Sequence, residues 1–217
     1  MSMIMPGLKE YRFMLTEFDY KLFQFINTAA GQGGFMDLLM RFFAEQAVYL
    51  FVLALLIYGC TRSERNRLMV LETAIAACAA FGVSKMWSLL YFRDRPFIGH
   101  DVVQLIAHKA TSSFPSNHAT GVFVIAAVIL LNRRPIGWVF FMLAVCVGFS
   151  RVWVGVHYPL DIIGGMVNGM LCAFIIHYAA TRWSRVNRTL LSIVRFYERL
   201  EQRIHTRIRK NPRQLTK

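Results

Sequence analysis

Long apolar runs separated by short polar segments dominate the chain from residue 47 onward. Five runs are apolar enough to form membrane helices, at 47–60, 68–92, 118–131, 136–149 and 161–180. Some are shorter than the roughly 20 residues of a full span, so their ends must extend into the flanking polar motifs. The pattern predicts an all-α fold, a polytopic membrane helical bundle with about five to six transmembrane helices.

The two ends of the chain have different patterns. Charged and aromatic positions alternate from 8 to 45, which is typical of amphipathic helices at the membrane interface, with a short extra span as the alternative. The residues after 180 are basic with periodic apolar positions, which predicts a helix on the membrane surface. We therefore expect an interfacial segment (1–45), a membrane core (46–180) and a basic cytoplasmic tail (181–217).

Composition supports a membrane protein. Of 217 residues, 56% are hydrophobic and 17% charged, and the mean hydropathy is +0.42. A soluble protein of this size needs more charge to cover its surface. A net charge of +13 is compatible with binding to nucleic acid. The basic residues lie in short loops and the tail, however, so we expect them to contact a membrane surface and expect no nucleic-acid partner. Four cysteines in apolar runs, Cys60, Cys78, Cys146 and Cys172, are expected to be small buried hydrophobes rather than metal ligands.

The basic residues also predict an orientation. Loop 61–67 carries three arginines, loop 132–135 carries two, and the tail carries eleven Lys or Arg. By the positive-inside rule these segments are cytoplasmic. The loops at 93–117 and 150–160 then share the periplasmic or extracellular face of the plasma (inner) membrane. Two spans separate these loops, so they lie on one side whatever the absolute orientation.

Those two loops hold three motifs with the residue types of phosphate chemistry: Arg95-Pro96, then Pro115-Ser116-Asn117-His118, then Ser150-Arg151 followed by His157 and Asp161. Pro159 suits the first turn of a helix, so Asp161 lies one turn from His157 and would hold its ring. A carboxylate on one ring nitrogen leaves the other free to attack. Taken alone, His157 is equally compatible with a membrane-interface histidine without chemistry.

The second motif opens a helix, whose free N–H groups and dipole suit a phosphate. Ser116 either caps this helix or donates to a phosphate oxygen, and His118 is suited to protonate a leaving oxygen. Arg95 and Arg151 supply planar cationic forks that match a pentacoordinate phosphoryl group. An arginine that only anchors the chain at the interface is the alternative for each of them.

Together the motifs resemble the type-2 phosphatidic-acid phosphatase superfamily, which shares its site with vanadium haloperoxidases. Its pattern is Lys-x6-Arg-Pro, Pro-Ser-Gly-His and Ser-Arg-x5-His-x3-Asp. The third motif matches at every defined position, Asn117 replaces the glycine of the second, and Ser88 replaces the lysine of the first, with Lys85 one turn earlier. Within the superfamily the chain looks most like the undecaprenyl-diphosphate phosphatases of the bacitracin-resistance type.

This resemblance implies a membrane hydrolase without metal or other cofactor. His157 attacks the terminal phosphorus to give a phosphohistidine, His118 protonates the leaving group, and Asp161 orients His157. The implied phosphate-binding residues are Arg95, Arg151, Ser116 and Asn117. The implied substrate is a polyprenyl diphosphate lipid, undecaprenyl diphosphate, whose hydrolysis to undecaprenyl phosphate recycles the cell-wall lipid carrier and confers bacitracin resistance. The alternatives are a phosphatidic-acid or phosphatidylglycerophosphate phosphatase, a lipid phosphotransferase, or a non-catalytic permease or lipid transporter.

Other polar and small residues allow two interpretations each. Four residues of the first motif loop either contact the second phosphate of a diphosphate or are simply solvated: Arg93, Asp94, His100 and Lys109. Glu72 and Asn168 lie within spans, where they serve either function or interhelical hydrogen bonding. Gly165 and Gly169 form a small-residue face, which favours close packing of one helix inside the bundle, with a dimer contact as the alternative.

Overall fold

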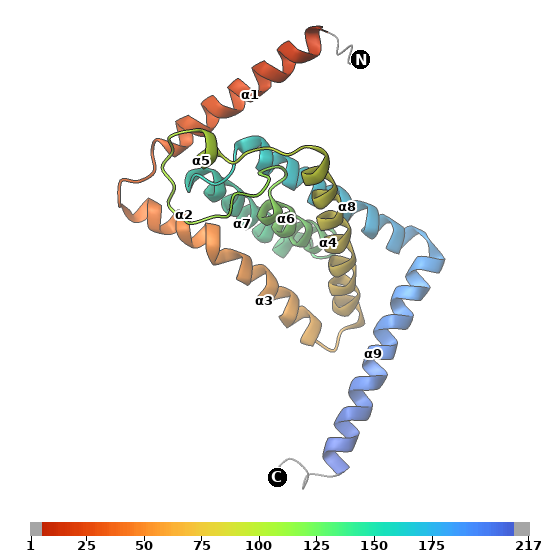
Figure 1. The fold of residues 1–217 in the computed structure, drawn as a ribbon. Helices are drawn as coiled ribbons and strands as arrows, with labels where there is room; N and C mark the ends of the chain where they lie inside the picture. The colour runs from red at the N-terminus through yellow and green to blue at the C-terminus, as the bar shows by residue number, and fades with distance from the viewer. Residues whose placement is uncertain (1–5, 211–217) are drawn as a thin grey trace.

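The structure, a computed structural model, describes residues 6–210 and the side chains of residues 13–203. Residues 6–210 contain helices and loops and no strand, which confirms the all-α prediction (Figure 1). The helices are α1 (Pro6–Asn27), α2 (Phe35–Glu45), α3 (Ala47–Cys60), α4 (Glu64–Leu90), α5 (Pro96–Gly99), α6 (Asn117–Asn132), α7 (Arg134–Trp153), α8 (Pro159–Arg182) and α9 (Ser184–Lys210).

The five predicted apolar runs fall in helices, except that the run at 68–92 extends two residues beyond the end of α4. α4, α7 and α8 are each long and apolar enough to cross a membrane. α2 and α3 reach that length together, with a bend of 44° between them. The apolar helix α6 has 16 residues, or about 24 Å, less than the roughly 30 Å hydrocarbon core of a bilayer. The chain is thus a multi-pass membrane protein, and the larger number of spans expected from the sequence stays a prediction.

α6 is the central helix and contacts α3, α4, α7 and α8. Its side chains are almost continuously buried between 119 and 129. α8 approaches it at Gly165 and Gly169, where an added Cβ atom would lie 2.6 Å from the carbonyl oxygens of Ser116 and Thr120. These small residues let two backbones pack directly, as their spacing predicted.

The outer face of the bundle is apolar. Large side chains such as Leu53 of α3 and Phe174 of α8 are more than half exposed, as expected for surfaces that contact lipid. Cys60, Cys78 and Cys146 are also exposed. The prediction that they are buried was wrong, because lipid is as apolar as a protein interior and satisfies such side chains equally well.

Polar side chains inside the spans pair between helices. Glu72 of α4 lies 3.0 Å from Nδ1 of His177 in α8, and its carboxylate accepts a hydrogen bond from Asn132 at the end of α6. Asn168 of α8 donates to the carbonyl oxygen of Ala80 in α4 over 2.9 Å. Of the two interpretations of Glu72 and Asn168, interhelical hydrogen bonding is the one that the structure contains.

α1 and α9 project from the bundle in different directions (Figure 1). The side chain of Asn27, at the end of α1, accepts from the N–H of Val103 and donates to the carbonyl oxygens of Val103 and Trp153, each over 2.9 Å. α9 is joined to α4 by an ion pair of 2.6 Å between Arg67 and Glu201. The boundaries proposed for the interfacial segment and the tail stay predictions.

The C-terminal ends of α4 and α7 and the N-terminal ends of α6 and α8 meet at one end of the bundle (Figure 1). The loop at 91–116 and the turn at 154–158 therefore lie together, which confirms the prediction from the parity of the spans. Ser113 of the loop and His157 of the turn are within 3.3 Å of each other. All three phosphate motifs converge on this end.

Candidate active site

His157 lies in the tight turn between α7 and α8. Gly155 has a φ of +81°, and a Cβ atom there would lie 2.5 Å from the carbonyl oxygen of Val103, so glycine is required. The turn folds back over α7, and the backbone N–H of His157 donates to the carbonyl oxygen of Arg151 over 3.3 Å. His157 is only 2% exposed. α8 begins at Pro159, as the sequence predicted.

The two ring nitrogens of His157 face different groups. Nε2 lies 3.1 Å from Nη1 of Arg95. A guanidinium can only donate, so Nε2 accepts and the neutral ring carries its proton on Nδ1. Nδ1 lies 3.3 Å from the hydroxyl of Ser113, which itself donates to Oδ2 of Asp161. This chain of hydrogen bonds holds the ring with the lone pair of Nε2 toward the arginine.

Asp161, in the first turn of α8, lies one helical turn after His157, as expected. The direct distance from Nδ1 of His157 to Oδ2 of Asp161 is 3.5 Å, at the limit for a hydrogen bond. The hydroxyl of Ser113 makes the shorter link between them. The sequence motifs assign no role to Ser113, because a serine ahead of the second motif has no distinctive spacing.

Electrostatics keep the ring of His157 neutral. Burial lowers the pKa of His157 to about 4, with contributions from the charges of Arg95 and Arg151 and against the opposing effect of Asp161. At neutral pH the lone pair of Nε2 is therefore free for reaction. The arrangement supplies a nucleophilic nitrogen without a separate base to deprotonate it.

Arg95 is fixed by the segment that follows α5 and by the turn between α7 and α8. Its guanidinium donates to the carbonyl oxygens of Thr111 and Val156 over 3.0 and 2.9 Å. Burial lowers the pKa of Arg95 to about 10, so it remains charged at neutral pH. The geometry presents a fixed cation beside Nε2 of His157.

Arg151, in the last turn of α7, is 2% exposed. Nη1 donates to the carbonyl oxygen of Ala44 in α2 over 2.9 Å, whereas Nε and Nη2 find no hydrogen-bond partner in the part of the chain that the structure describes. A buried unsatisfied donor costs about 1–3 kcal/mol. These two donors could be satisfied by the oxygens of a bound phosphate.

Two further histidines lie near His157. His118, the second residue of α6, is half-buried and close enough to Arg151 and His157 to interact with them electrostatically. The ring centroid of His108 lies 6.2 Å from that of His157. Nδ1 of His108 faces the carbonyl oxygen of Lys109 over 3.1 Å, so Nδ1 carries the proton and Nε2 has the lone pair. No sequence motif indicates His108, which lies in an irregular loop outside the three motifs.

Ser116 occupies the N-cap of α6 and is fully buried. Its hydroxyl accepts from the N–H of Ala119 over 3.5 Å, and its own N–H donates to the carbonyl oxygen of Asp161 over 3.0 Å. Of the two roles considered for Ser116, capping is the one with a contact in the structure. Its role toward phosphate stays a prediction.

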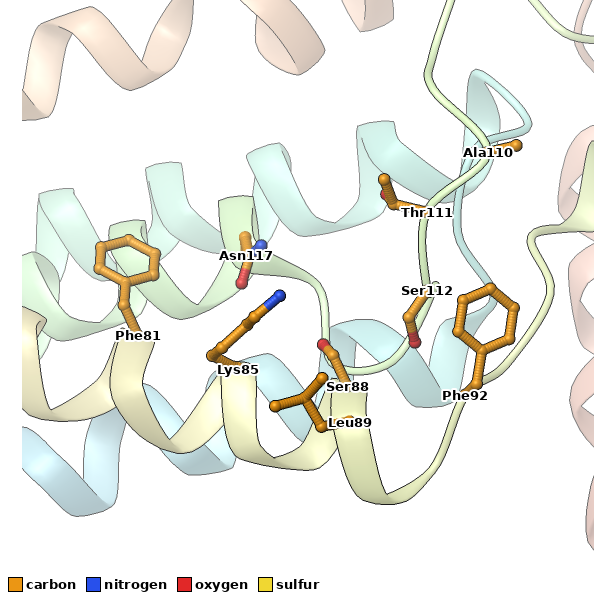
Figure 2. A pocket seen from close by; sticks show the side chains of 9 residues that line it. All are labelled: Phe81, Lys85, Ser88, Leu89, Phe92, Ala110, Thr111, Ser112 and Asn117. Carbon is orange, nitrogen blue, oxygen red and sulfur yellow. The ribbon is translucent and has the colours of Figure 1, made fainter.

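Asn117 lies beside the other motif residues, in a cavity of about 540 Å³. Lys85 and Ser88 of α4 line the same cavity, and Figure 2 shows Lys85 and Asn117 pointing into it. Thr111 and Ser112, whose backbone oxygens bind Arg95, form another part of its wall. The cavity therefore adjoins the arginine end of the site.

Two of the four additional loop residues contact other parts of the protein, although His100 remains exposed. Arg93 is 14% exposed and forms ion pairs of 2.8 Å with Asp161 and 2.6 Å with Asp19. His100 stacks on Tyr20 of α1, with ring centroids 3.9 Å apart. The interpretation of Arg93 as simply solvated was wrong, because its guanidinium is paired with two carboxylates. A contact with a second phosphate stays a prediction.

The chain matches the sequence profile of the PAP2 superfamily over residues 67–185. This match covers more than half of the chain and includes all three phosphate motifs. The protein belongs to the PAP2 superfamily and is a membrane phosphatase of that family.

Two relatives extend the similarity over most of the chain. The bacitracin transport permease protein BcrC of Bacillus licheniformis is 36% identical over 190 residues, 87% of this chain and 92% of that protein. The undecaprenyl-diphosphatase BcrC of Bacillus subtilis (strain 168) is 36% identical over 184 residues, 83% of this chain and 92% of that protein. The crystal structure of Aquifex aeolicus LpxE shares the fold with a TM-score of 0.64 and 26% identity, and covers 73% of this chain and 93% of LpxE.

Proposed function

We propose that the protein hydrolyses undecaprenyl diphosphate to undecaprenyl phosphate and inorganic phosphate through a phosphohistidine at His157. The observation that carries this proposal is the 3.1 Å contact that holds the lone pair of a buried, neutral His157 against the cation of Arg95. The name of the B. subtilis relative, an undecaprenyl-diphosphatase, supports this lipid as the substrate.

In the first step, Nε2 of His157 bonds to the terminal phosphorus as the bond from phosphorus to the bridging oxygen breaks. The electron pair leaves with that oxygen, which takes a proton from His118. Arg95 and Arg151 stabilise the charge on the equatorial oxygens. The phosphorylated ring keeps its proton on Nδ1, and this N–H forms a hydrogen bond toward Ser113 and Asp161.

In the second step, water attacks the phosphohistidine and gives a proton to His118. The bond from phosphorus to Nε2 breaks, its electron pair returns to the ring of His157, and inorganic phosphate leaves. His118 then has the proton for the next cycle, so it acts first as acid and then as base. Asn117 and Ser116 are proposed to hold phosphate oxygens at the start of α6.

We further propose that the site opens on the non-cytoplasmic face of the plasma membrane. The basic loops and α9 lie at the other end of the bundle, which supports this orientation by the positive-inside rule. Hydrolysis on that face would return undecaprenyl phosphate to cell-wall synthesis. It would also remove the diphosphate form that bacitracin sequesters, and so raise resistance to the drug.

The test is phosphate release from undecaprenyl diphosphate by the purified protein in detergent with excess chelator, beside His157→Ala. We expect release by the wild type and a loss of at least about a thousandfold in a folded His157→Ala protein. Full activity of a monodisperse His157→Ala protein would contradict the proposal. Release only from phosphatidic acid or phosphatidylglycerophosphate would keep the chemistry and reject the substrate. Release from none of these lipids would favour the permease role that names the B. licheniformis relative.

A further inference from the structure

A buried carboxylate on α1 reaches into the active site. The side chain of Asp19 is 0% exposed, although its neighbour Phe18 on the same helix is largely exposed. A carboxylate is costly to bury unless it is paired and hydrogen-bonded. Oδ1 of Asp19 accepts from the backbone N–H of Leu160 in α8 over 2.9 Å, and Oδ2 binds Arg93 over 2.6 Å. One oxygen thus contacts Leu160, three residues after His157, and the other contacts Arg93, which also binds Asp161.

Arg93 joins this carboxylate to that of Asp161. Nη2 binds Asp19 and Nη1 binds Oδ1 of Asp161 over 2.8 Å, while the guanidinium lies 4.0 Å from the ring centroid of Tyr158. The other oxygen of Asp161, Oδ2, accepts from Ser113 and from the N–H of Tyr158. Both oxygens of Asp161 are therefore held in place. Oδ1 is held by Arg93, and Oδ2 is held by Ser113 and Tyr158.

We infer that Asp19 and Arg93 are positioning residues of the active site, through which helix α1 holds Asp161 and thereby His157. This inference rests on the proposed function, because it assigns Asp161 the task of orienting a nucleophilic histidine. Asp19 lies outside residues 67–185, the part matched by the family profile.

The charges give Asp19 a role beyond anchoring. One guanidinium is shared by two carboxylates, so the cluster of Asp19, Arg93 and Asp161 has a net charge of −1. Without the charge of Asp19, Arg93 would cancel the charge of Asp161 beside a site that also holds Arg95 and Arg151. A negative charge on Asp161 stabilises the Nδ1–H of His157 when the ring becomes a phosphorylated cation.

The anchoring of α1 has a separate basis. Asn27 makes three hydrogen bonds to Val103 and Trp153, and none of these residues touches Asp161 in the described contacts. On the same helix, Glu17 forms an exposed ion pair of 2.7 Å with Lys21. Glu17→Gln therefore removes the same charge as Asp19→Asn, two residues away, without touching the site.

The experiment measures steady-state kinetics of the full chain in detergent on two substrates, undecaprenyl diphosphate and p-nitrophenyl phosphate. Asp19→Asn keeps an acceptor for the N–H of Leu160 and removes the charge. We expect its kcat to fall about ten- to a hundredfold, with KM within about twofold of wild type. The unfolding temperature should stay close to that of wild type, and Glu17→Gln should behave as wild type.

A double-mutant cycle tests whether Asp19 affects catalysis through Arg93 or only stabilises the fold. Because Asp19 acts through Arg93, the variant Asp19→Asn/Arg93→Gln should be no slower than Arg93→Gln alone. Additive losses in the cycle, or a wild-type kcat for Asp19→Asn, would overturn the inference. A lower unfolding temperature and a raised KM in Asp19→Asn would also overturn it, because they would show that Asp19 only anchors α1. If the wild type hydrolyses only p-nitrophenyl phosphate, the proposed lipid substrate is rejected. The effect of Asp19→Asn is then measured on p-nitrophenyl phosphate.

Discussion

One N–H of Arg95 points at Nε2 of His157 over 3.1 Å, so the nitrogen that faces the arginine carries a lone pair and not a proton. Any phosphate that reaches Nε2 therefore meets the cation of Arg95 at the same moment. Three backbone carbonyls hold Arg95 in place, which means that this donor is oriented before substrate arrives. Donors fixed in advance stabilise a developing anion better than mobile ones, because they do not reorganise during the reaction.

The link between His157 and Asp161 runs through Ser113, so Ser113→Ala should slow catalysis. The expected fall in kcat is about ten- to a hundredfold, because the ring loses its partner at Nδ1 while Asp161 keeps Arg93 and Tyr158. KM should change little. Steady-state phosphate release checks this, with the exposed Ser192→Ala on α9 as a control. An unchanged kcat in Ser113→Ala would show that the direct approach of Asp161 is enough.

The depressed pKa of His157 predicts a ring that stays neutral in mild acid. In the unfolded chain a histidine takes up its proton near pH 6.5, whereas burial lowers the pKa of His157 to about 4 in the folded protein. Between these two values the unfolded chain binds the extra proton, so His157 makes folding stability decrease as pH falls through this window. Proton–carbon NMR of labelled histidine in detergent would follow the ring, with His157→Gln for assignment. A midpoint between pH 6 and 7 would contradict the prediction.

Arg151 has two buried donors without a described partner, so replacing it should separate stability from activity. Arg151→Met should raise the free energy of unfolding by about 1–3 kcal/mol, because an unpaired buried charge is removed. The same variant should lose turnover. Thermal unfolding with and without inorganic phosphate checks both points, since phosphate should stabilise the wild type and leave Arg151→Met unchanged. A less stable variant that still binds phosphate would exclude this role.

Close packing of α8 on α6 predicts that Gly169 tolerates no side chain. A Cβ atom there would lie 2.6 Å from the carbonyl oxygen of Thr120, and Gly169→Val should cost roughly 1–3 kcal/mol through overpacking. Gly82→Val in α4 is the matched control, because a Cβ at Gly82 would have no atom within 4 Å apart from its chain neighbours and the backbone of its own helix. Unfolding temperatures in one detergent compare the two. Equal effects would mean that helix propensity, and not packing, determines the cost.

Much of the fold could be predicted from local sequence. A membrane helix must bury its backbone polar groups in its own hydrogen bonds, so long apolar runs indicate helices directly. The start of α8 at Pro159 and the separation of one helical turn between His157 and Asp161 follow from local geometry as well. Because two spans separate the motif loops, the sequence also predicts that these loops lie at the same end of the bundle.

The residues that surround His157 depend on how distant segments pack together. Ser113 meets Asp161 across 48 residues of sequence, and Asp19 meets Arg93 across 74. Neither pair has a local spacing that could indicate its contact, and His108 lies in an irregular loop with no periodicity. A hydrogen bond depends on where two atoms lie in space, and helix packing and loop conformation set that position. The sequence alone thus determined the helices and the chemical types at their ends, while tertiary packing selected the partners that orient the nucleophile.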